Sequence, residues 1–346
     1  MCHTCQVTSL IISRPVCIIG LGLIGGSLLR SLTQQNIPAY GFNRSPSGAK
    51  AARKDGFDAS SHLIETLERA EKDNALIVLA TPMPAIDSLL ADIATYAPSC
   101  GFTDVVSVKT EVYNLVCKHN MQDKYVGGHP MAGTANSGWS ASVDDLFRGA
   151  AWVITFDHAV DAQDKPSKAW ISLWNDVAAM ALAVGAEVIP ARVAQHDAAV
   201  ARISHLPHLL AETLAIIGDN GGALSLSLAA GSFRDGTRVA GTEPSLVQAM
   251  CETNAPALLT ALDEALSLLS DTRQQLLKDS PSIHELADAG YRSRIRYEAR
   301  SGARDTDSVS PAKISHRPVF RVHPGAPGWV GTLIQAENLG ARIEVF

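Results

Sequence analysis

The first half of the chain alternates short apolar runs with longer stretches in which apolar residues recur at helical spacing. The apolar, often β-branched runs predict strands at VCIIG (16–20), ALIVLA (75–80), TDVVSV (103–108), KYVGG (124–128) and AWVITF (151–156). Stretches between them, such as SHLIETLERAEK and PAIDSLLADIATYA, have the periodicity of amphipathic helices. Strands that are almost continuously apolar and alternate with helices are typical of a parallel sheet covered on both faces. We therefore predict an α/β domain over residues 1–160.

The second half of the chain is mostly helical. Helical runs are expected at 169–184, 191–217 and 244–277, with an interruption at Pro207, and AEVIP is a short strand candidate. The long runs are rich in alanine and leucine over much of the helix circumference, so neighbouring helices or another subunit must bury them. We therefore expect an all-helical dimerisation domain over 161–290 and a homodimer.

The end of the chain changes character again. The polar stretch ARDTDSVSPAKISH precedes PVFRVH, PGWVGTLIQAENL and ARIEVF, which predict a strand, a helix and a strand. We interpret residues 291–346 as a linker followed by a short β-α-β-like C-terminal extension.

Composition narrows the class of protein. The chain has 346 residues, of which 46% are hydrophobic and 18% charged. This composition is typical of a globular protein, and the length is sufficient for two domains. A net charge of −6 provides no basic field for nucleic acid. No run approaches the ~18 consecutive apolar residues of a membrane span. The start lacks the basic region and cleavage site of a signal peptide, so we expect a cytoplasmic protein.

The six cysteines are scattered, and we expect free thiols. Cys2, His3 and Cys5 could contribute to a metal site, but no second ligand pair follows at zinc spacing. We interpret them as part of a frayed terminus and expect no metal.

The first predicted strand leads into GLGLIGGS, which places Gly20, Gly22 and Gly25 in the spacing of a dinucleotide-binding turn. In such a turn the first glycine allows the tight bend and the second lets a pyrophosphate approach the backbone. The third lets helix pack on strand. The helix start then offers unpaired N–H groups to the phosphates. Thr81 and Pro82, after the third strand, are expected to line the same Rossmann-type site.

The second strand ends in YGFNRS, where an NAD enzyme usually carries an acid for the ribose hydroxyls. Here Asn43, Arg44 and Ser45 occupy that place. Arg44 can bind a 2′-phosphate through its forked guanidinium, and Ser45 can donate a hydrogen bond. We therefore expect NADP to be preferred, with NAD possible. Alternatively, Arg44 stacks on the adenine, which is compatible with either cofactor.

Polar groups follow the strands at the edge where an open α/β sheet binds its ligand. Ser107 and Lys109 come after VV in VVSVKT, and His129 ends the fifth strand in GGHP. We expect Gly127 and Gly128 to remove side-chain bulk beside the nicotinamide while the following proline stiffens the exit. His129 can then act near pH 7, where imidazole is a useful base.

In this order the motifs resemble the prephenate/arogenate dehydrogenases, enzymes of tyrosine biosynthesis. The resemblance rests on GLGLIGGSL, VVSVK, GGHPMAGT, HDAAVARISHLPH and FRDGTRVAGTEPSL, and covers roughly residues 16–270. It implies a dinucleotide domain followed by a helical dimerisation domain, and oxidative decarboxylation of prephenate or arogenate. It also implies that His129 polarises the ring hydroxyl and that Ser107 lies against both.

The resemblance assigns further residues to the substrate side. Arg238 corresponds to the arginine that binds a substrate carboxylate, and His208 to the substrate-side histidine; Thr134 closes the GGHPMAGT motif. His205 lies on nearly the same helix face as His208, so either histidine could be the structural one. Arg234 is the weaker arginine candidate.

Further assignments stay open. His196 and Asp197 are interpreted as helix-packing or positioning residues. Glu243 could meet the ammonium of arogenate, or Thr242 and Glu243 could serve a helix start at Pro244. Residues 311–346 are too short for the full ACT domain that many members carry. Two other functions are an NADP-dependent dehydrogenase of the β-hydroxyacid type and a non-catalytic NADPH-sensing regulator.

Overall fold

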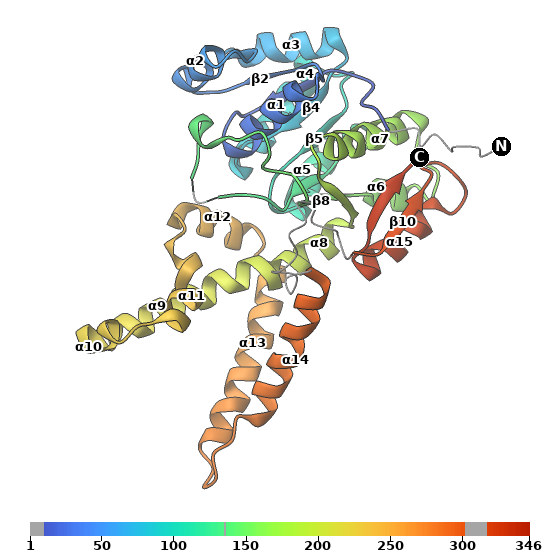
Figure 1. Cartoon of the computed structure of the whole chain (residues 1–346). Coiled ribbons are helices and arrows are strands. Elements are labelled where there is room, and N and C mark those ends of the chain that lie inside the picture. The colour runs from blue at the N-terminus through green and yellow to red at the C-terminus, as the bar shows by residue number, and fades with distance from the viewer. Residues whose placement is uncertain (1–9, 135, 302–316) are drawn as a thin grey trace, which may run out of the picture. The chain divides into compact units, whose positions relative to one another are not determined.

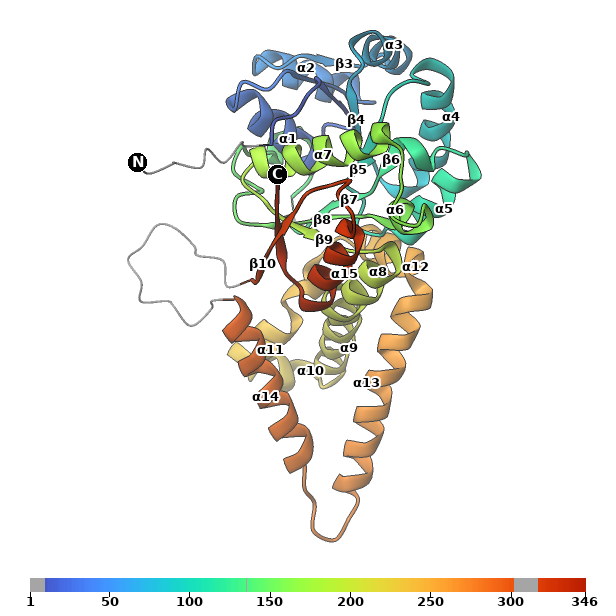
Figure 2. The same ribbon diagram turned by 90° about the vertical axis from the view of Figure 1, so that its right-hand side faces the viewer.

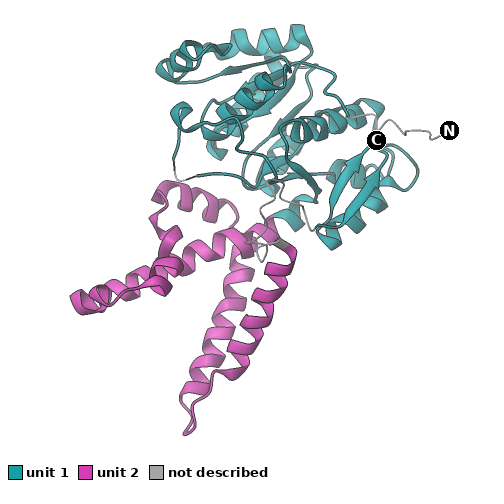
Figure 3. Cartoon of the chain, in the orientation of Figure 1, with its two compact units in different colours: residues 1–196, 317–346 teal, residues 197–316 magenta. Residues whose placement is uncertain are grey.

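The computed structural model describes residues 10–134, 136–301 and 317–346, which form two compact units. Unit 1 comprises Met1–His196 and Arg317–Phe346, and unit 2 comprises Asp197–His316 (Figure 3). None of the helices in the described ranges is long and apolar enough to cross a membrane.

Unit 1 is built on a parallel sheet with the strand order β3-β2-β1-β4-β5-β6 (Figure 1). The strands are β1 (Val16–Ile19), β2 (Ala39–Phe42), β3 (Ala59–Ser60), β4 (Leu76–Leu79), β5 (Phe102–Asp104) and β6 (Tyr125–Val126). The helices between them are α1 (Leu23–Gln34), α2 (Pro46–Lys54), α3 (Leu63–Asp73), α4 (Ile86–Tyr96) and α5 (Thr110–Lys118). This is the order of a dinucleotide-binding fold, so the predicted α/β class is confirmed.

The central strand β1 shows why these residues form a buried parallel sheet. Its side chains alternate between two hydrophobic clusters, with Val16 and Ile18 in one and Cys17 and Ile19 in the other. Successive strand side chains point to opposite faces, so an unbroken apolar run fits a strand covered on both sides.

A second sheet, β7-β8-β9, corrects two strand predictions. Its strands are β7 (Gly128–Pro130), β8 (Ala151–Ile154) and β9 (Glu187–Pro190), with β7 antiparallel and β9 parallel to β8. KYVGG is therefore two strands in two sheets, and AWVITF does not join the main sheet. The change occurs at Gly127, whose N–H donates to Thr155 Oγ1 at 2.9 Å and whose carbonyl accepts from the Thr155 N–H at 2.9 Å.

The predicted strand TDVVSV is also shorter than expected. Only its first two residues belong to β5, which ends at Asp104. The Asp104 carboxylate accepts a hydrogen bond from the Val106 N–H at 2.7 Å, which turns the chain out of the sheet.

The C-terminal extension is part of unit 1. It forms β10 (Val319–Val322), α15 (Trp329–Leu339) and β11 (Arg342–Val345), and the two strands pair in parallel. Helix α15 and strand β11 pack against β9 (Figure 2). The Trp329 ring lies edge-on to that of Trp174, 5.8 Å between centroids, and both are buried. The extension therefore completes the main hydrophobic core.

The units divide the chain at residues 196 and 317, whereas the sequence predicts boundaries at 160 and 290. The helices α6 (Asp157–Asp161) and α7 (Lys168–Ala183) belong to unit 1. The indole N–H groups of α7 explain this, because Trp170 donates to the carbonyl of Tyr125 and Trp174 to that of Thr155.

Unit 2 is entirely helical in its described part. Its helices are α9 (Leu206–Asn220), α10 (Gly222–Ser227), α11 (Gly231–Thr237), α12 (Pro244–Thr253), α13 (Ala255–Leu276) and α14 (His284–Ser301). Helix α8 (Val193–Val200) leads into it from unit 1. A small core holds Val247, Cys251 and Leu258 together.

Pro207 does not interrupt the helical path as predicted. A π-helical segment, Ala201–His205, joins α8 to α9, and the Leu206 N–H donates to the Ala201 carbonyl. Proline lacks an N–H and its ring clashes with the carbonyl four residues earlier, and a wider turn just before it accommodates both effects.

Candidate active site

The turn after β1 has the geometry expected of a dinucleotide cradle. Gly20 has φ +110°, and a Cβ there would lie 2.4 Å from the Ala80 carbonyl oxygen. A Cβ on Gly25 would lie 1.9 Å from the Gly20 carbonyl oxygen, so only glycine lets α1 start this close to the turn. A Cβ on Gly22 would meet nothing within 4 Å. Backbone at Gly22 is thus open to a ligand, next to the N-terminus of α1.

A cavity of about 870 Å³ extends from this turn. The predicted cofactor residues that line it are Gly20, Gly22, Asn43, Arg44, Ser45, Thr81 and Pro82. Thr81 Oγ1 is buried and has no hydrogen-bond partner among the described residues. A buried hydroxyl without a partner is costly, and a bound dinucleotide could satisfy it. The lining therefore fits a dinucleotide.

The end of β2 presents one cationic side chain to this cavity. Asn43 is occupied locally, because its Oδ1 accepts from the Ser45 N–H at 3.2 Å and its Nδ2 donates to the Leu21 carbonyl at 3.4 Å. Ser45 caps α2, with its hydroxyl 2.8 Å from that of Ser47. Arg44 is exposed and forms no ion pair within the described part of the chain.

Sequence reasoning missed two residues of the cavity wall. Asp92 and Trp139 both line it, but they lie on α4 and in the loop after β7, far along the chain from the glycine turn. Trp139 Nε1 donates to Asp55 Oδ2 at 2.9 Å, and the Arg30 guanidinium lies 4.2 Å from its ring centroid. In the sequence, the signal for Trp139 was its position directly after Gly138. In the structure this glycine has φ +81°.

His129 lies in β7 and pairs with another imidazole. Its Nδ1 is 2.8 Å from Nε2 of His196 on α8, and the rings meet edge-on with 5.0 Å between centroids. His196 is 3% exposed. The sequence predicts His196 only as a packing or positioning residue. Its direct contact with His129 could not be read from a pair separated by 67 positions.

The glycine pair before His129 has a different role from the one predicted. A Cβ on Gly127 would lie 2.7 Å from both Thr155 Oγ1 and the Tyr125 hydroxyl. A Cβ on Gly128 would lie 2.7 Å from the Asp104 carbonyl oxygen. The space beside both glycines is thus filled by other atoms of the protein. The glycines let the chain cross closely past β5 and β8, and this crossing positions His129.

Lys109 is not exposed at the site edge. It is fully buried and forms an ion pair with Asp104, whose other oxygen accepts from the Tyr125 hydroxyl at 2.6 Å. A buried, hydrogen-bonded pair of this kind organises the end of β5. Ser107 is half-buried in the loop between β5 and α5, and no hydrogen bond joins it to His129 within the described ranges.

Unit 2 carries the predicted substrate residues His205, His208 and Arg238. His205 is 1% exposed, and its Nδ1 lies 3.1 Å from Asn254 Nδ2. His208 is half-buried, and its Nδ1 has no hydrogen-bond partner among the described residues. Arg238 is exposed at the start of a 3₁₀ turn, Arg238–Gly241. His205 thus has a partner within its own unit, which makes His208 the stronger ligand candidate.

Three other predicted residues, Thr134, Arg234 and Glu243, are exposed. Thr134, in unit 1, is exposed, and its Oγ1 accepts from the Asn136 N–H at 3.2 Å. Arg234 is exposed and lies 3.8 Å from Asp235, its neighbour in sequence. Glu243 precedes Pro244 at the start of α12, and its side chain makes no capping hydrogen bond.

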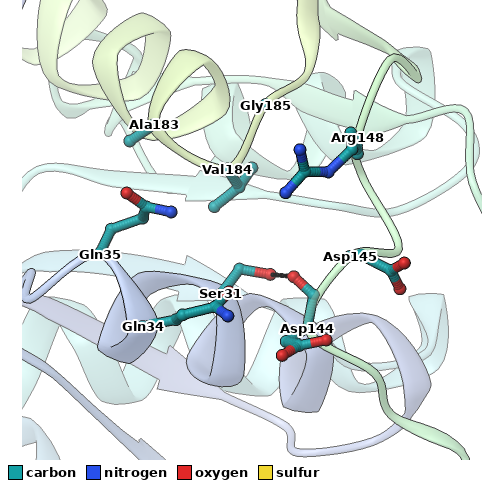
Figure 4. Close-up of a pocket in the computed structure, with 9 residues that line it drawn as sticks. All are labelled: Ser31, Gln34, Gln35, Asp144, Asp145, Arg148, Ala183, Val184 and Gly185. Carbon is teal, nitrogen blue, oxygen red and sulfur yellow. Dashed lines mark hydrogen bonds between the residues drawn. The ribbon is translucent and has the colours of Figure 1, made fainter. Parts of the chain in front are cut away.

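A separate, smaller cavity of about 180 Å³ contains none of the predicted site residues (Figure 4). It lies between the end of α1, the end of α7 and the loop before β8. The Ser31 hydroxyl donates to the Asp144 carbonyl across its floor at 2.7 Å. No titratable cluster in it suits catalysis.

Cys2, His3 and Cys5 lie outside the described residues. Within the described ranges, no group of three or more His, Cys, Asp or Glu side chains could hold a metal ion. Cys17, Cys100, Cys117 and Cys251 are free thiols, as predicted for the cysteines that the structure describes.

Comparison with known proteins gives consistent matches to both halves of the chain. The model of the nucleotide-binding domain of prephenate dehydrogenase matches residues 25–182, and that of its dimerization domain matches residues 192–280. Cyclohexadienyl dehydrogenase of Zymomonas mobilis is 31% identical over 270 residues, which cover 75% of this chain and 87% of the relative.

Two crystal structures are similar over most of the chain. A Corynebacterium glutamicum protein provisionally named prephenate dehydrogenase is 63% identical with a TM-score of 0.90, covering 97% of this chain and 100% of that one. Arogenate dehydrogenase of Synechocystis is 28% identical with a TM-score of 0.66, covering 82% of this chain and 99% of that one.

Proposed function

Since the chain belongs to the prephenate dehydrogenase family, we propose that it oxidises and decarboxylates prephenate or arogenate, with NADP as the preferred cofactor. The products are 4-hydroxyphenylpyruvate or tyrosine. The enzyme is an NAD(P)-dependent oxidoreductase of tyrosine biosynthesis. The observation that carries the proposal is the His129–His196 pair in the same unit as the glycine cradle.

His129 acts as the base that takes the proton of the substrate's ring hydroxyl. When bound, the nicotinamide would supply the acceptor for the hydride that leaves C4 of that ring. A neutral imidazole can accept at Nε2 only if its proton is on Nδ1, and the neighbouring His196 Nε2 can accept that Nδ1–H. The hydroxyl oxygen becomes a carbonyl, CO₂ leaves, and the electrons of the broken carbon–carbon bond make the ring aromatic. The Ser107 hydroxyl contacts the same ring hydroxyl.

Arg238 binds a substrate carboxylate, for which a forked guanidinium is the natural partner. His208, whose Nδ1 is buried without a partner among the described residues, donates to the substrate from the same helical unit. Thr134 contributes a hydroxyl from the loop that follows His129. These assignments follow the family motifs and the burial of each side chain within its own unit.

NADP is preferred because the end of β2 offers a guanidinium and no carboxylate. Arg44 has no competing ion pair in the described chain, so it is available for a 2′-phosphate. The Ser45 hydroxyl is next to it, at the start of α2.

For arogenate as the substrate, we propose that Glu243 meets its ammonium; the alternative role of Glu243 is at the start of α12, before Pro244. The Glu243 carboxylate makes no capping hydrogen bond and can meet the substrate ammonium. The variant Glu243→Gln should then raise KM for arogenate and leave KM for prephenate unchanged. An unchanged KM for arogenate rejects this role.

Unit 2 joins two copies of the chain into a homodimer. The family model of its dimerization domain supports this, as do the exposed leucines of its helices. These include Leu210, Leu214, Leu224, Leu228, Leu266 and Leu269.

Initial rates with prephenate and with arogenate, each combined with NADP and with NAD, test the proposal. Rapid turnover in one of the four combinations supports it and identifies substrate and cofactor together. Absence of turnover in all four, by protein that binds NADP, would contradict it.

A further inference from the structure

The first turn of α8, which carries His196, is held by two carboxylates. The Arg192 N–H donates to Glu337 Oε1 at 2.6 Å, and the Val193 N–H donates to Asp157 Oδ2 at 3.0 Å. The first N–H groups of a helix have no partner within the helix, and negative charge there also favours the helix dipole. Both carboxylates therefore stabilise the start of α8 in one position.

Glu337 holds Arg192 by side chain as well as by backbone. Its Oε2 accepts from Arg192 Nε at 2.9 Å and from Nη2 at 2.5 Å. The Glu337 side chain is 7% exposed, so water screens this ion pair little. One carboxylate thus makes three contacts to a single residue, which restricts both the position and the rotation of the helix start.

The connection from Arg192 to His129 is short. The Arg192 carbonyl accepts the first helical hydrogen bond from the His196 N–H at 2.9 Å. His196 is therefore one turn beyond the anchored residue, and its Nε2 lies 2.8 Å from His129 Nδ1. Displacement of the helix start moves the imidazole that lies against Nδ1 of His129.

Glu337 can act in this way because its own helix is fixed. It lies on α15 in the C-terminal extension, where Trp329, Leu333 and Ala336 are buried in the main core of unit 1. The sequence suggests no chemistry for this extension.

We propose that Glu337 is a positioning residue for the reaction, holding His196 against His129 through Arg192. The C-terminal extension thereby contributes to catalysis without contacting substrate. This inference rests on the proposed function for its kinetic consequence, but the geometry it describes can be tested without turnover.

The kinetic experiment compares Glu337→Ala, Glu337→Gln and Glu344→Gln with the wild type. Glu344, on β11 of the same extension, pairs with Arg342 at 3.4 Å and with Arg321 at 3.7 Å, and no hydrogen bond or ion pair joins it to α8 in the described chain, so it is the matched control. A misplaced base stabilises the transition state less well, so Glu337→Ala should lower kcat by about 10- to 100-fold. We expect KM and the Kd of NADP to stay within about twofold of the wild-type values. The kcat of each variant is expressed per cofactor-binding site.

Glu337→Gln should recover part of the lost kcat, because its amide oxygen still accepts from the Arg192 N–H. Glu344→Gln should behave as the wild type. A Glu337→Ala kcat equal to that of the control, or a loss that parallels a loss of cofactor sites, overturns the proposal. If Glu337→Ala does not fold, Glu337→Gln decides: a kcat equal to the control overturns it.

The second measurement needs no substrate. The ring ¹⁵N chemical shifts of His129, assigned by their absence from His129→Asn, report which nitrogen carries the proton. In the wild type and Glu344→Gln they should show one fixed tautomer, and in the Glu337 variants they should move toward an average of two. Identical shifts in all variants overturn the proposal. If the wild type turns over neither substrate, the proposed function fails while the shifts still decide the role of Glu337.

Discussion

At the residue scale, the proposed choice between two cofactors depends on one guanidinium. Arg44 is exposed beside the glycine cradle, while its neighbour Asn43 is tied to the backbone of Leu21 and Ser45. A cofactor with a 2′-phosphate therefore meets a positive charge at this point, and one without it gains little from the same side chain. The proposed preference for NADP therefore rests on a single position.

Replacing Arg44 by alanine should raise the Kd of NADP by about 10- to 100-fold, as expected for a lost charge-assisted hydrogen bond. The Kd of NAD should change by less than about threefold. Isothermal titration with both cofactors measures this. Lys50→Ala is the control, because Lys50 is an exposed cation on the following helix, α2, and does not line the cavity. Equal losses for both cofactors would mean that Arg44 stacks on the adenine.

The sequence predicts single residues well where their role is local. Gly20, Gly22 and Gly25 could be assigned because the tight turn, the open backbone and the close helix contact follow from spacing alone. His196 and Glu337 could not. Their partners lie 67 and 145 positions away, and only the folded chain brings them together.

At the scale of elements, the strand that carries His129 depends on a close crossing. β6 ends in one sheet and β7 begins in the next, with Gly127 between them. The apolar pattern predicts one strand here because both pieces are buried. It contains no information on the sheet to which each piece belongs, since that depends on Thr155 and on the backbone of β5.

The crossing predicts a large cost for a single methyl group. Gly128→Ala places a Cβ 2.7 Å from the Asp104 carbonyl oxygen, and overpacking of this kind should lower the free energy of unfolding by about 1–3 kcal/mol. Gly133→Ala is the matched control, because a Cβ there meets nothing within 4 Å. Urea denaturation of both variants measures the difference. Equal stabilities would contradict the close crossing at Gly128.

The contribution of Asp157, which accepts from the Val193 N–H at the start of α8, depends on pH. Burial raises the pKa of Asp157 to about 6 from 3.8, and the nearby charges of Asp161 and Glu337 add to the effect. Between these values the folded chain keeps a proton that the unfolded chain loses. The contribution of Asp157 to the free energy of unfolding therefore falls as the pH rises through this window.

Asp157→Asn removes this titration and still accepts from the Val193 N–H. Relative to the wild type, the variant should gain free energy of unfolding as the pH rises from 4 to 7, by up to about 3 kcal/mol. Thermal and urea denaturation at several pH values measure the difference. A difference that is constant with pH contradicts the assignment.

At the scale of the whole molecule, the two units have different surfaces. Unit 1 buries most of its large apolar side chains in two continuous clusters, whereas unit 2 has a core of few residues and many exposed leucines. The helical pattern predicts this, because helices apolar over much of their circumference need a second covering layer. A single copy of unit 2 does not provide it.

The chain should therefore have twice its 36.7 kDa mass in solution, as measured by light scattering after size exclusion. Leu266→Glu on α13, at a side chain 53% exposed in the single chain, should weaken the dimer. Leu339→Glu, at a similarly exposed leucine of α15 in unit 1, should not. A wild-type monomer, or equal effects of the two substitutions, contradicts a dimer through unit 2.

The position of the C-terminal extension in the sequence also determines when unit 1 can complete its core during synthesis. Unit 1 is interrupted by residues 197–316, so its last helix and strands leave the ribosome only after all of unit 2. At about 5–20 residues per second those residues take roughly 6–24 s. During this interval Trp174 lacks the cover of Trp329, and α8 lacks the carboxylate of Glu337. Until residues 317–346 are made, the nascent unit 1 thus keeps apolar surface uncovered, and we expect chaperones to bind it during this interval.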